Sequence, residues 1–437
     1  MSKASVIFTF KDKETVIECL TTEKLINICK RYISKIKDDI SRLYFMYNGN
    51  IINKESTYEE LKIEKDKNSI NILVGEINPN HKRIINENNI IKNEINNNYN
   101  NYIIGEINIK KEDVNNNIKI ISSFEECKRE NKWVDKEYDY IYENEFEIKN
   151  NIIIYINNKL IRFNYYYRFK ESGIYEIKYI FKKNISHINF MFDNCNSLVK
   201  LDLSNFNTQN VTNMCDMFNR CYNLKKIILD NFKTQNVYDM SFMFYYCESL
   251  ENLDLSNFNT QNVTNMRSMF GFCCSLTDLD LSNFDTQNVK NMRNMFCECN
   301  SLKNLNLSNF NTQNVTDIRS IFYKCKSLEY LDLSSFNTCN IINMKHMFNG
   351  CESLINIDLS SFNTEKVISM KEMFYGCKSL QNLDLSNFDT RKVFDRNKMF
   401  YGCNSLLNVD LSNFNNEKRF DFLRCNSLFY KNKIFNN

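Results

Sequence analysis

A cysteine recurs with a 26-residue period through the second half of this chain, and nine of them keep that spacing without interruption. They are Cys195, Cys221, Cys247, Cys273, Cys299, Cys325, Cys351, Cys377 and Cys403. The frame around each cysteine reads approximately MFxxCxSLxxLDLSNFNTQNVTNM. A fixed period of this length is typical of repeat proteins in which each unit stacks on the next. Such a stack offers a long surface and no obvious catalytic pocket, so binding is the expected activity.

Charge and hydropathy narrow the choice of partners and compartment. The 437 residues include 56 basic and 53 acidic side chains, so a net charge of +3 favours neither nucleic acid nor a membrane surface. The first twenty residues contain no apolar signal-peptide core, and no window of 18 apolar residues predicts a membrane insertion. We therefore expect a cytoplasmic protein with reduced thiols, and keep the cell surface as the alternative.

Each repeat predicts a strand followed by a short helix. In the segment LVKLDLSNF, Leu198, Leu201 and Leu203 fall on the inward face and Asp202 on the opposite face. Residues 211–221, VTNMCDMFNRC, carry apolar side chains at intervals of three and four, the spacing of one face of a helix. The expected fold class is an α/β solenoid of parallel strands and short helices.

The repeat also resembles a known family. Its L-x-x-L-x-L spacing, with the segments MFxxCxSL and LSNFNTQNVTNM, is similar to the BspA-like leucine-rich repeats over residues 188–428. The resemblance implies a leucine-rich-repeat solenoid at 188–437. The interval from Cys403 to Cys425 is shorter than the regular period, and we interpret this last repeat as a shortened C-terminal cap. Many members of that family are described as surface proteins, which implies the alternative function of a cell-surface adhesin for host or matrix protein or glycan.

Residues 1–76 form a separate predicted domain with the order strand, strand, helix, strand, strand. The segment RLYFMYNGNIINKESTYEEL resembles ubiquitin, which implies an α+β ubiquitin-like domain with the β-grasp fold. In that family an apolar patch on the sheet binds partners, and two of its positions correspond to Tyr44 and Leu73. The closing strand runs on into the chain without a terminal Gly-Gly pair. We therefore expect a docking domain and not a conjugated tag.

The region between the two predicted domains divides into two parts. Residues 77–102 are rich in asparagine and read as a linker. Residues 103–187 alternate apolar and polar side chains and are rich in Ile, Tyr and Phe, which predicts antiparallel strands. We expect this β-rich region to cap the first open end of the solenoid, because terminal repeats need a cover.

The outward positions of the expected strands form a column of aspartates, interrupted at Ile228 and Asn306. We interpret five of its members as the partner-binding residues of a concave face: Asp254, Asp280, Asp332, Asp358 and Asp384. Carboxylates one strand apart repel each other, so a basic partner or a cation would stabilise them. The alternative is a solvated strand face kept polar to prevent aggregation.

Other columns have simpler interpretations. A basic column reads as a solvated helix face that offsets the helix dipole: Arg267, Arg293, Arg319, Lys345 and Lys371. A threonine column is expected to satisfy backbone groups inside the loops. The cysteine column reads as a reduced packing ladder, with disulfides or a four-sulfur metal site near Cys273 and Cys299 as the less favoured alternatives.

Catalysis has little support in the sequence. The three histidines are widely separated, and no nucleophile-elbow, phosphate-loop or zinc-protease motif occurs. We therefore expect no enzyme, no cofactor and no metal. The expected function is a non-catalytic scaffold or adaptor with protein partners, glycan being possible and nucleic acid not expected. The solenoid would hold one partner and the N-terminal domain a second.

Overall fold

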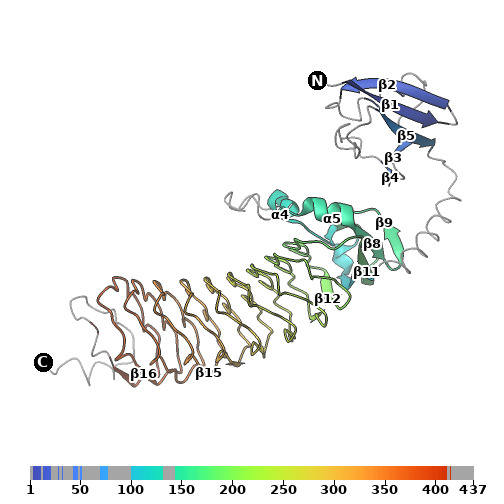
Figure 1. Ribbon diagram of the computed structural model, residues 1–437. Coiled ribbons are helices and arrows are strands. Elements are labelled where there is room, and N and C mark those ends of the chain that lie inside the picture. Colours follow the sequence, from blue (N-terminus) through green and yellow to red (C-terminus); the bar gives the residue numbers. More distant parts are fainter. Residues whose placement is uncertain are drawn as a thin grey trace. The chain divides into compact units, whose positions relative to one another are not determined.

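The computed structural model describes residues 3–10, 13–20, 28, 32, 43–47, 50–51, 69–76, 100–130, 143–410 and 414. The chain divides into two compact units, Met1–Asn97 and Asn98–Asn437 (Figure 1).

The described residues of the first unit form a five-stranded mixed sheet. Its strands are β1 (Lys3–Phe10), β2 (Lys13–Leu20), β3 (Leu43–Tyr47), β4 (Asn50–Ile51) and β5 (Ser69–Glu76). They lie in the order β2-β1-β5-β3-β4, and β1 and β5 run parallel while the other neighbours are antiparallel. Val, Ile and Phe in β1, and Val and Ile in β2, are residue types that favour strands.

The second unit begins with a strand-rich block, which we name the cap, at residues 102–181. Its strands are β6 (Tyr102–Ile109), β7 (Ile118–Lys119), β8 (Ile152–Ile156), β9 (Lys159–Ile161), β10 (Tyr166–Tyr167) and β11 (Gly173–Phe181). A 3₁₀ turn, η2 (Lys111–Asp113), and the helices α4 (Phe124–Glu130) and α5 (Glu145–Asn151) complete it. The sequence did not predict these two helices.

The cap joins the repeats through continuous strand pairing. The sheet order is β13-β12-β6-β11-β8-β9, in which β12 (Leu198–Asp202) and β13 (Lys226–Ile228) belong to the first two repeats. Strand β6 pairs antiparallel with β12, whereas β12 and β13 run parallel. The backbone groups on the open side of β12 are thereby bonded to β6 instead of being left at an unpaired edge.

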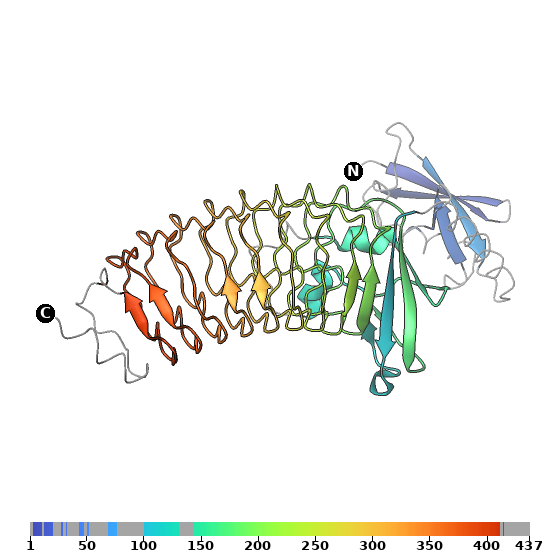
Figure 2. The same cartoon turned by 90° about the horizontal axis from the view of Figure 1, so that it is seen from below.

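Beyond the cap, the chain winds into 26-residue coils that we name the coil stack, residues 187–410 (Figure 2). Its later strands are β14 (Asn304–Leu305), β15 (Tyr330–Leu331), β16 (Asn382–Asp384) and β17 (Asn408–Asp410). These short strands pair parallel with the equivalent strand one coil away. A second row of single parallel bridges runs from His187 through Asn213 and Asp239 to Asp395.

The coil stack contains no helix, so the predicted α/β solenoid was wrong. Residues 211–221 form turns, because the backbone enters the left-handed region at Asp216 (φ 55°) and Arg220 (φ 59°). The same two positions have positive φ in the following coils. A right-handed helix cannot pass through such residues. Backbone groups bond to the next coil instead, as Phe218 N–H does to the Met243 carbonyl at 2.9 Å.

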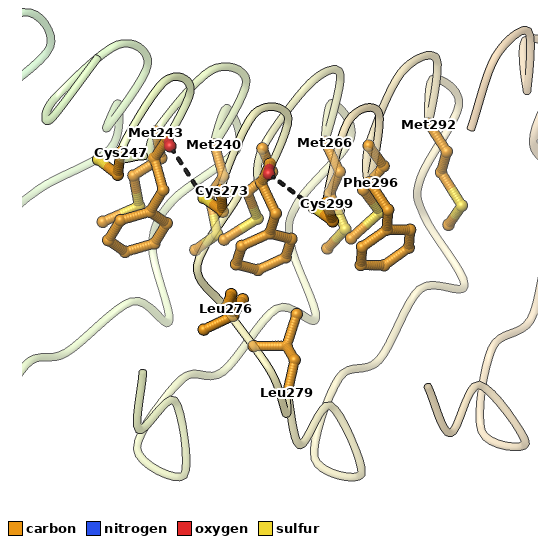
Figure 3. Packing of buried hydrophobic residues seen from close by; sticks show 14 of the residues in the cluster. Met240, Met243, Cys247, Met266, Cys273, Leu276, Leu279, Met292, Phe296 and Cys299 are labelled. Carbon is orange, nitrogen blue, oxygen red and sulfur yellow. Dashed lines mark hydrogen bonds between the residues drawn. The ribbon is translucent and has the colours of Figure 1, made fainter. Parts of the chain in front are cut away.

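Even without helices, the apolar spacing of the repeat fills a continuous core. Columns of Met, Phe, Leu and Cys are almost completely buried from the first coil to the last. Figure 3 shows these columns stacked in successive coils. The ring of Phe270 lies 5.9 Å from that of Phe244 and 5.8 Å from that of Phe296, nearly parallel to both. Each coil therefore buries its apolar side chains against its neighbours, as expected for a repeat protein.

The nine cysteines of the column are completely buried, which confirms that they pack in the core. The column also makes hydrogen bonds that were not predicted. The thiol of Cys273 donates to the Phe244 carbonyl at 3.2 Å, and that of Cys299 to the Phe270 carbonyl at 3.1 Å (Figure 3). Burial raises the pKa of these thiols, so they remain protonated donors.

The threonine column joins neighbouring coils, as predicted. The Thr234 hydroxyl donates to the Asn259 carbonyl at 2.8 Å and accepts the Asn259 N–H at 2.7 Å. Thr260 and Thr286 donate in the same way to the next coil. A buried hydroxyl thus forms hydrogen bonds with backbone groups in the loops, which have no partner from strand pairing.

Candidate functional site

The five aspartates predicted to bind a partner lie in register along the coil stack. Asp254 and Asp280 are exposed, and each accepts the backbone N–H of the serine two residues later at 2.9 Å. The other three make the same bond: Asp332, Asp358 and Asp384. This arrangement is an Asx turn, a local structural role that the sequence analysis did not predict.

The turn itself does not require a negative charge. Asn306 occupies the same column, and its side-chain oxygen accepts the Ser308 N–H at 3.1 Å. For the aspartates the bonds from the serine lower the carboxylate pKa at Asp254, Asp280, Asp332 and Asp358. No cation among the described residues forms an ion pair with any of the five aspartates. The five carboxylates thus form a row to which no described residue supplies a paired cation.

The two other predicted binding residues lie in the first unit. Tyr44 in β3 pairs with Gly75 in β5, and Leu73 in β5 pairs with Met46 in β3. Leu73 also lies opposite Thr9 of β1. The register therefore places Tyr44 and Leu73 on neighbouring strands of one sheet, in a different unit from the aspartates.

The basic column has a different setting from the one predicted. Its five residues lie on turns, so there is no helix dipole for them to offset, and all are half-buried: Arg267, Arg293, Arg319, Lys345 and Lys371. Arg319 pairs with Asp317 at 2.6 Å. The Arg267 guanidinium lies over the Phe242 ring, 5.1 Å from its centroid. This aromatic neighbour was missed because it belongs to the preceding coil and is therefore distant in the sequence.

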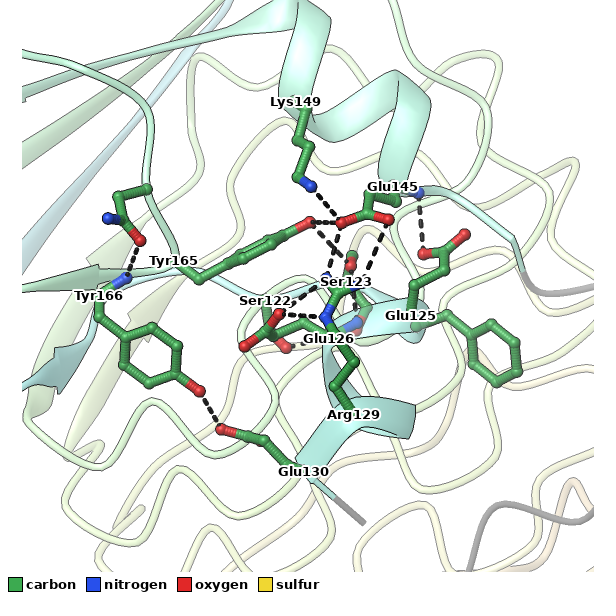
Figure 4. Close-up of polar contacts among 12 residues, drawn as sticks. Ser122, Ser123, Glu125, Glu126, Arg129, Glu130, Glu145, Lys149, Tyr165 and Tyr166 are labelled. Atoms are coloured by element: carbon green, nitrogen blue, oxygen red, sulfur yellow. Dashed lines mark hydrogen bonds and ion pairs between the residues drawn. The ribbon is translucent and has the colours of Figure 1, made fainter. Parts of the chain in front are cut away.

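A polar cluster in the cap connects its two helices (Figure 4). The Glu145 carboxylate on α5 bonds to Arg129 of α4 at 2.7 Å, to Lys149 at 2.5 Å and to the Tyr165 hydroxyl at 3.0 Å. Although burial opposes ionisation, these donors hold the Glu145 pKa at about 2. The Tyr165 hydroxyl is also 3.0 Å from Ser123. Such a saturated network fixes the helices and leaves no free acid or base.

A buried acidic group lies where the cap meets the first coils. The side chain of Asp193 is fully buried and bonds to Arg220 at 3.3 Å, with Lys119 4.0 Å away. Asp216 accepts the Cys215 thiol at 2.8 Å and the Asn219 amide at 2.6 Å. Burial raises the Asp216 pKa to about 8. The junction therefore contains two buried carboxyl groups, Asp193 and Asp216, whose pKa values burial raises.

One serine–histidine pair has no catalytic geometry. Ser186 Oγ lies 2.9 Å from His187 Nδ1 and donates to Glu147 at 2.9 Å, while Glu147 lies 4.0 Å from the same Nδ1. A catalytic triad needs the acid on one ring nitrogen and the nucleophile on the other. Glu147 also accepts the backbone N–H of Ser186 and of His187. Its role is therefore to anchor this loop.

Neither metal nor small-molecule chemistry is supported in the part of the chain that the structure describes. No group of three or more His, Cys, Asp or Glu side chains there could hold a metal ion. A hollow of about 580 Å³ on the cap is open to solvent and lined partly by cations: Lys159, Arg162 and Arg168. It contains no pair of a nucleophile and a base. Within the described ranges, no helix is long and apolar enough to span a membrane.

The fold defines a class: a capped repeat protein made of parallel-paired 26-residue coils. A family model described as "Mycoplasma protein of unknown function, DUF285" matches residues 163–278, 223–330 and 316–437. Because these matches cover well over half of the chain, the protein belongs to this family. No curated protein matches the chain.

Both resemblances drawn from the sequence were wrong. The matching family model is DUF285, and neither a BspA-like nor another leucine-rich-repeat model matches. The L-x-x-L-x-L spacing misled because any coil with a short inward-facing strand produces it, whereas this coil has turns where a helix was expected. No ubiquitin-like domain is identified either. That resemblance rested on one stretch, residues 42–61, most of which lies outside the described residues.

Proposed function

We propose that this protein is a non-catalytic binding scaffold whose aspartate column holds a basic segment of a protein partner. The observation that carries the proposal is the difference between Asn306 and its aspartate neighbours. The coil tolerates a neutral amide at this position, as at Asn306, and a side chain without any acceptor, as at Ile228, yet most coils carry a carboxylate. A function outside the turn therefore accounts for the charge.

The energetics favour a cationic occupant. Like charges one coil apart raise the energy of the free protein. Asp280 opposes ionisation of Asp254, and Asp332 opposes that of Asp358. A chain of lysine or arginine side chains would relieve this repulsion without any conformational change. In a column with one carboxylate per coil, affinity would grow with the number of coils engaged.

The test uses a matched pair of substitutions in one coil of the full chain. Asp280→Asn removes the charge and keeps the acceptor for Ser282. Asp285→Asn makes the same change at an exposed aspartate whose Asx turn serves Gln287 and which lies outside the column. With decalysine as the probe, Asp280→Asn should weaken binding several-fold, because one charge contact is lost.

The control Asp285→Asn should leave decalysine affinity within about twofold of the wild type. Asp285 lies outside the aspartate column, and salt screens the attraction between its exposed charge and a probe bound along that column. If both variants lose affinity equally, decalysine recognises overall charge and the column has no special role. If neither changes, the column is a solvated strand face and the proposal fails.

The proposal includes a second docking surface and a location. Tyr44 and Leu73 would contact a second partner, and a photo-crosslinking residue at position 44 in the full chain should capture it, whereas one at position 285 should not. We place the protein in the cytoplasm. Labelling of intact cells by a membrane-impermeant reagent would instead favour the alternative of a surface adhesin.

A further inference from the structure

We propose that the partner segment held by the coil stack is a basic amphipathic helix, which packs its apolar side chains on the last four coils. The inference rests on the function proposed above and names the kind of segment that the aspartate column binds. Its starting point is three apolar side chains that the coil stack leaves exposed. Tyr330 is 65% exposed, Ile355 42% and Leu407 66%.

The three apolar side chains share one face with the aspartates. Alternate residues of an extended segment point to the same side, so Tyr330 and Asp332 point outward together, on either side of a buried leucine. Ile355 and Leu407 lie in the neighbouring column, one position earlier in the repeat. Backbone bonds join them through Gln381, whose N–H donates to the Ile355 carbonyl at 3.0 Å and whose carbonyl accepts the Leu407 N–H at 2.8 Å.

This face carries acids and no cations in the last four coils. We name the outward strip its positions 329–330, 332, 355–356, 358, 381–382, 384, 407–408 and 410. The strip contains Glu329 and four aspartates but no lysine or arginine. The equivalent positions of earlier coils include four lysines, of which only the last borders the strip: Lys200, Lys225, Lys226 and Lys303.

Other cations close to the outward strip in the sequence lie at its margin. Lys326 and Lys378 each precede it by three residues, and Lys378 is paired with Glu352 at 2.6 Å. The strip itself therefore combines negative charge with exposed apolar surface. A segment that carries both positive charge and apolar side chains is complementary to it on both counts, whereas a purely basic segment would leave the apolar side chains uncovered.

The backbone of the coils favours a helix over an extended segment. An extended segment binds at an open strand edge, where its N–H and C=O groups find partners. Strand β16 pairs with β17 on one side, and its Asn382 bridges to Asn356 on the other, so these backbone groups are already bonded to neighbouring coils. A helix satisfies its own backbone groups and presents side chains to the strip.

The spacing of the coils also suits a helix that crosses them. Strands paired in parallel lie about 4.8 Å apart, so the last four coils span about 14 Å. One face of an α-helix repeats about every 5.4 Å, whereas one face of an extended chain repeats about every 6.7 Å. Successive helical turns therefore stay closer in step with successive coils. One stripe of the helix would bear lysine or arginine for the aspartates, and the adjacent stripe apolar residues.

Fluorescence anisotropy of labelled peptides with the full chain tests the proposal. The helical probe combines ten lysines with three leucines at intervals of four residues, which places the leucines on one helix face. The extended probe has the same composition with the leucines at intervals of two, on one face of a strand. Decalysine has the same charge without apolar side chains. The helical probe should bind about tenfold more tightly than either of the others.

The variants take their new residues from other coils, so that the fold is kept. Tyr330→Asn introduces the asparagine found one coil before and one coil after, and Leu407→Gln the glutamine of the preceding coil. Each should weaken the helical probe about tenfold and decalysine by about twofold or less, because decalysine uses the charges. The control Phe394→Thr removes a side chain that is 64% exposed in another column and should leave both affinities unchanged.

The outcomes separate this inference from the proposed function. If Asp358→Asn weakens decalysine but the leucines add no affinity, the aspartate column binds basic segments and the helix is overturned. If Asp358→Asn weakens neither probe, or neither probe binds, both proposals fail. Tighter binding of the extended probe, or an equal loss in Phe394→Thr, would overturn the inference alone.

Two further measurements guard against other roles of the exposed side chains. The unfolding midpoints of Tyr330→Asn and Leu407→Gln should match that of the wild type, and a fall in both would mean that these side chains stabilise the fold. Sedimentation of the full chain should show a monomer. Self-association that Leu407→Gln abolishes would assign the outward strip to a second copy of the chain and overturn the proposal.

Discussion

At the scale of single residues, several columns of polar side chains in the repeat bond to backbone groups. Cysteine thiols, threonine hydroxyls and Asx side chains all bond to the main chain of their own or a neighbouring coil. The sequence predicted which columns are buried, because an invariant apolar period can face only the core. It did not predict the thiol bonds, since cysteine packs equally well as a small hydrophobic residue.

The thiol bond leads to a ranking of two substitutions at Cys299. If the thiol serves as a donor to Phe270, Cys299→Ser should be more stable than Cys299→Ala, because serine keeps a donor. Cys299→Ala should lose about 1–2 kcal/mol, from the bond and from the small cavity. Urea unfolding measures both. The reverse ranking would mean that the cysteine acts only as an apolar filler, since burying a hydroxyl then costs energy.

Asp216 should make stability depend on pH. Burial raises its pKa from 3.8 to about 8, so the folded state keeps a proton that the unfolded state releases above pH 4. Its contribution is therefore complete below about pH 4 and is lost as the pH rises to about 8. Asp216→Asn removes the titrating carboxyl group, keeps one of its two accepting oxygens and suits the positive φ of 55°.

Thermal unfolding between pH 5 and 8 tests this assignment. The wild type should lose stability across that range, and Asp216→Asn should lose less, so that their difference widens with pH. Parallel curves for the two proteins would show that another group controls the pH dependence. Asp193, which is also buried beside Arg220 and Lys119, would be the next residue to replace.

At the scale of elements, the sequence failed where backbone conformation outweighs side-chain spacing. Residues 211–221 have helical apolar spacing, yet two left-handed residues per coil convert the segment into turns. One signal of this was present in the sequence. Gly350, Gly376 and Gly402 occupy one column, immediately before the cysteine, and all have positive φ. Glycine repeated at one position of a repeat indicates a left-handed residue more directly than apolar spacing indicates a helix.

Two of these glycines should differ in their tolerance of alanine. At Gly376 (φ 70°) an added Cβ would meet nothing closer than 3.9 Å, so Gly376→Ala should cost only the backbone strain, about 1 kcal/mol. At Gly350 (φ 77°) the Cβ would lie 2.9 Å from Lys324 Cγ and 3.3 Å from its Cα, so Gly350→Ala should cost more. Chemical unfolding of both variants measures the difference. Equal losses would contradict this account of the turn.

At the scale of the whole chain, the sequence predicted that the units repeat and stack, but it did not predict that each coil contains turns in place of a helix. Because the apolar columns recur in register, each coil presents a similar packing surface to its neighbours. Strand β6 of the cap pairs with β12 through residues far apart in the sequence, a contact that no local pattern specifies. The 26-residue period alone was enough to predict which residues share a column. The hydrogen bonds of the column residues, and the lack of ion pairs to the aspartates among the described residues, became visible only in the structure.

Removal of one coil should leave a folded protein. Deleting residues 289–314 joins Asn288 to Val315, the same Asn-Val junction that the chain already contains at 314–315. Every column stays in register, so circular dichroism should retain its shape and the unfolding midpoint should fall only slightly. Deleting only residues 289–301 shifts the register by half a coil and should abolish cooperative unfolding. Similar behaviour of the two deletions would argue against interchangeable coils.

Hydrogen–deuterium exchange of the full chain, with and without decalysine, tests the central claim most directly. The account predicts slower exchange at the serine amides that follow the aspartates, recurring coil after coil at Ser256, Ser282, Ser334 and Ser360. The segments around the basic column should be unchanged. Protection confined to a single coil, or spread equally over both charge columns, would contradict a binding surface that runs along the aspartates.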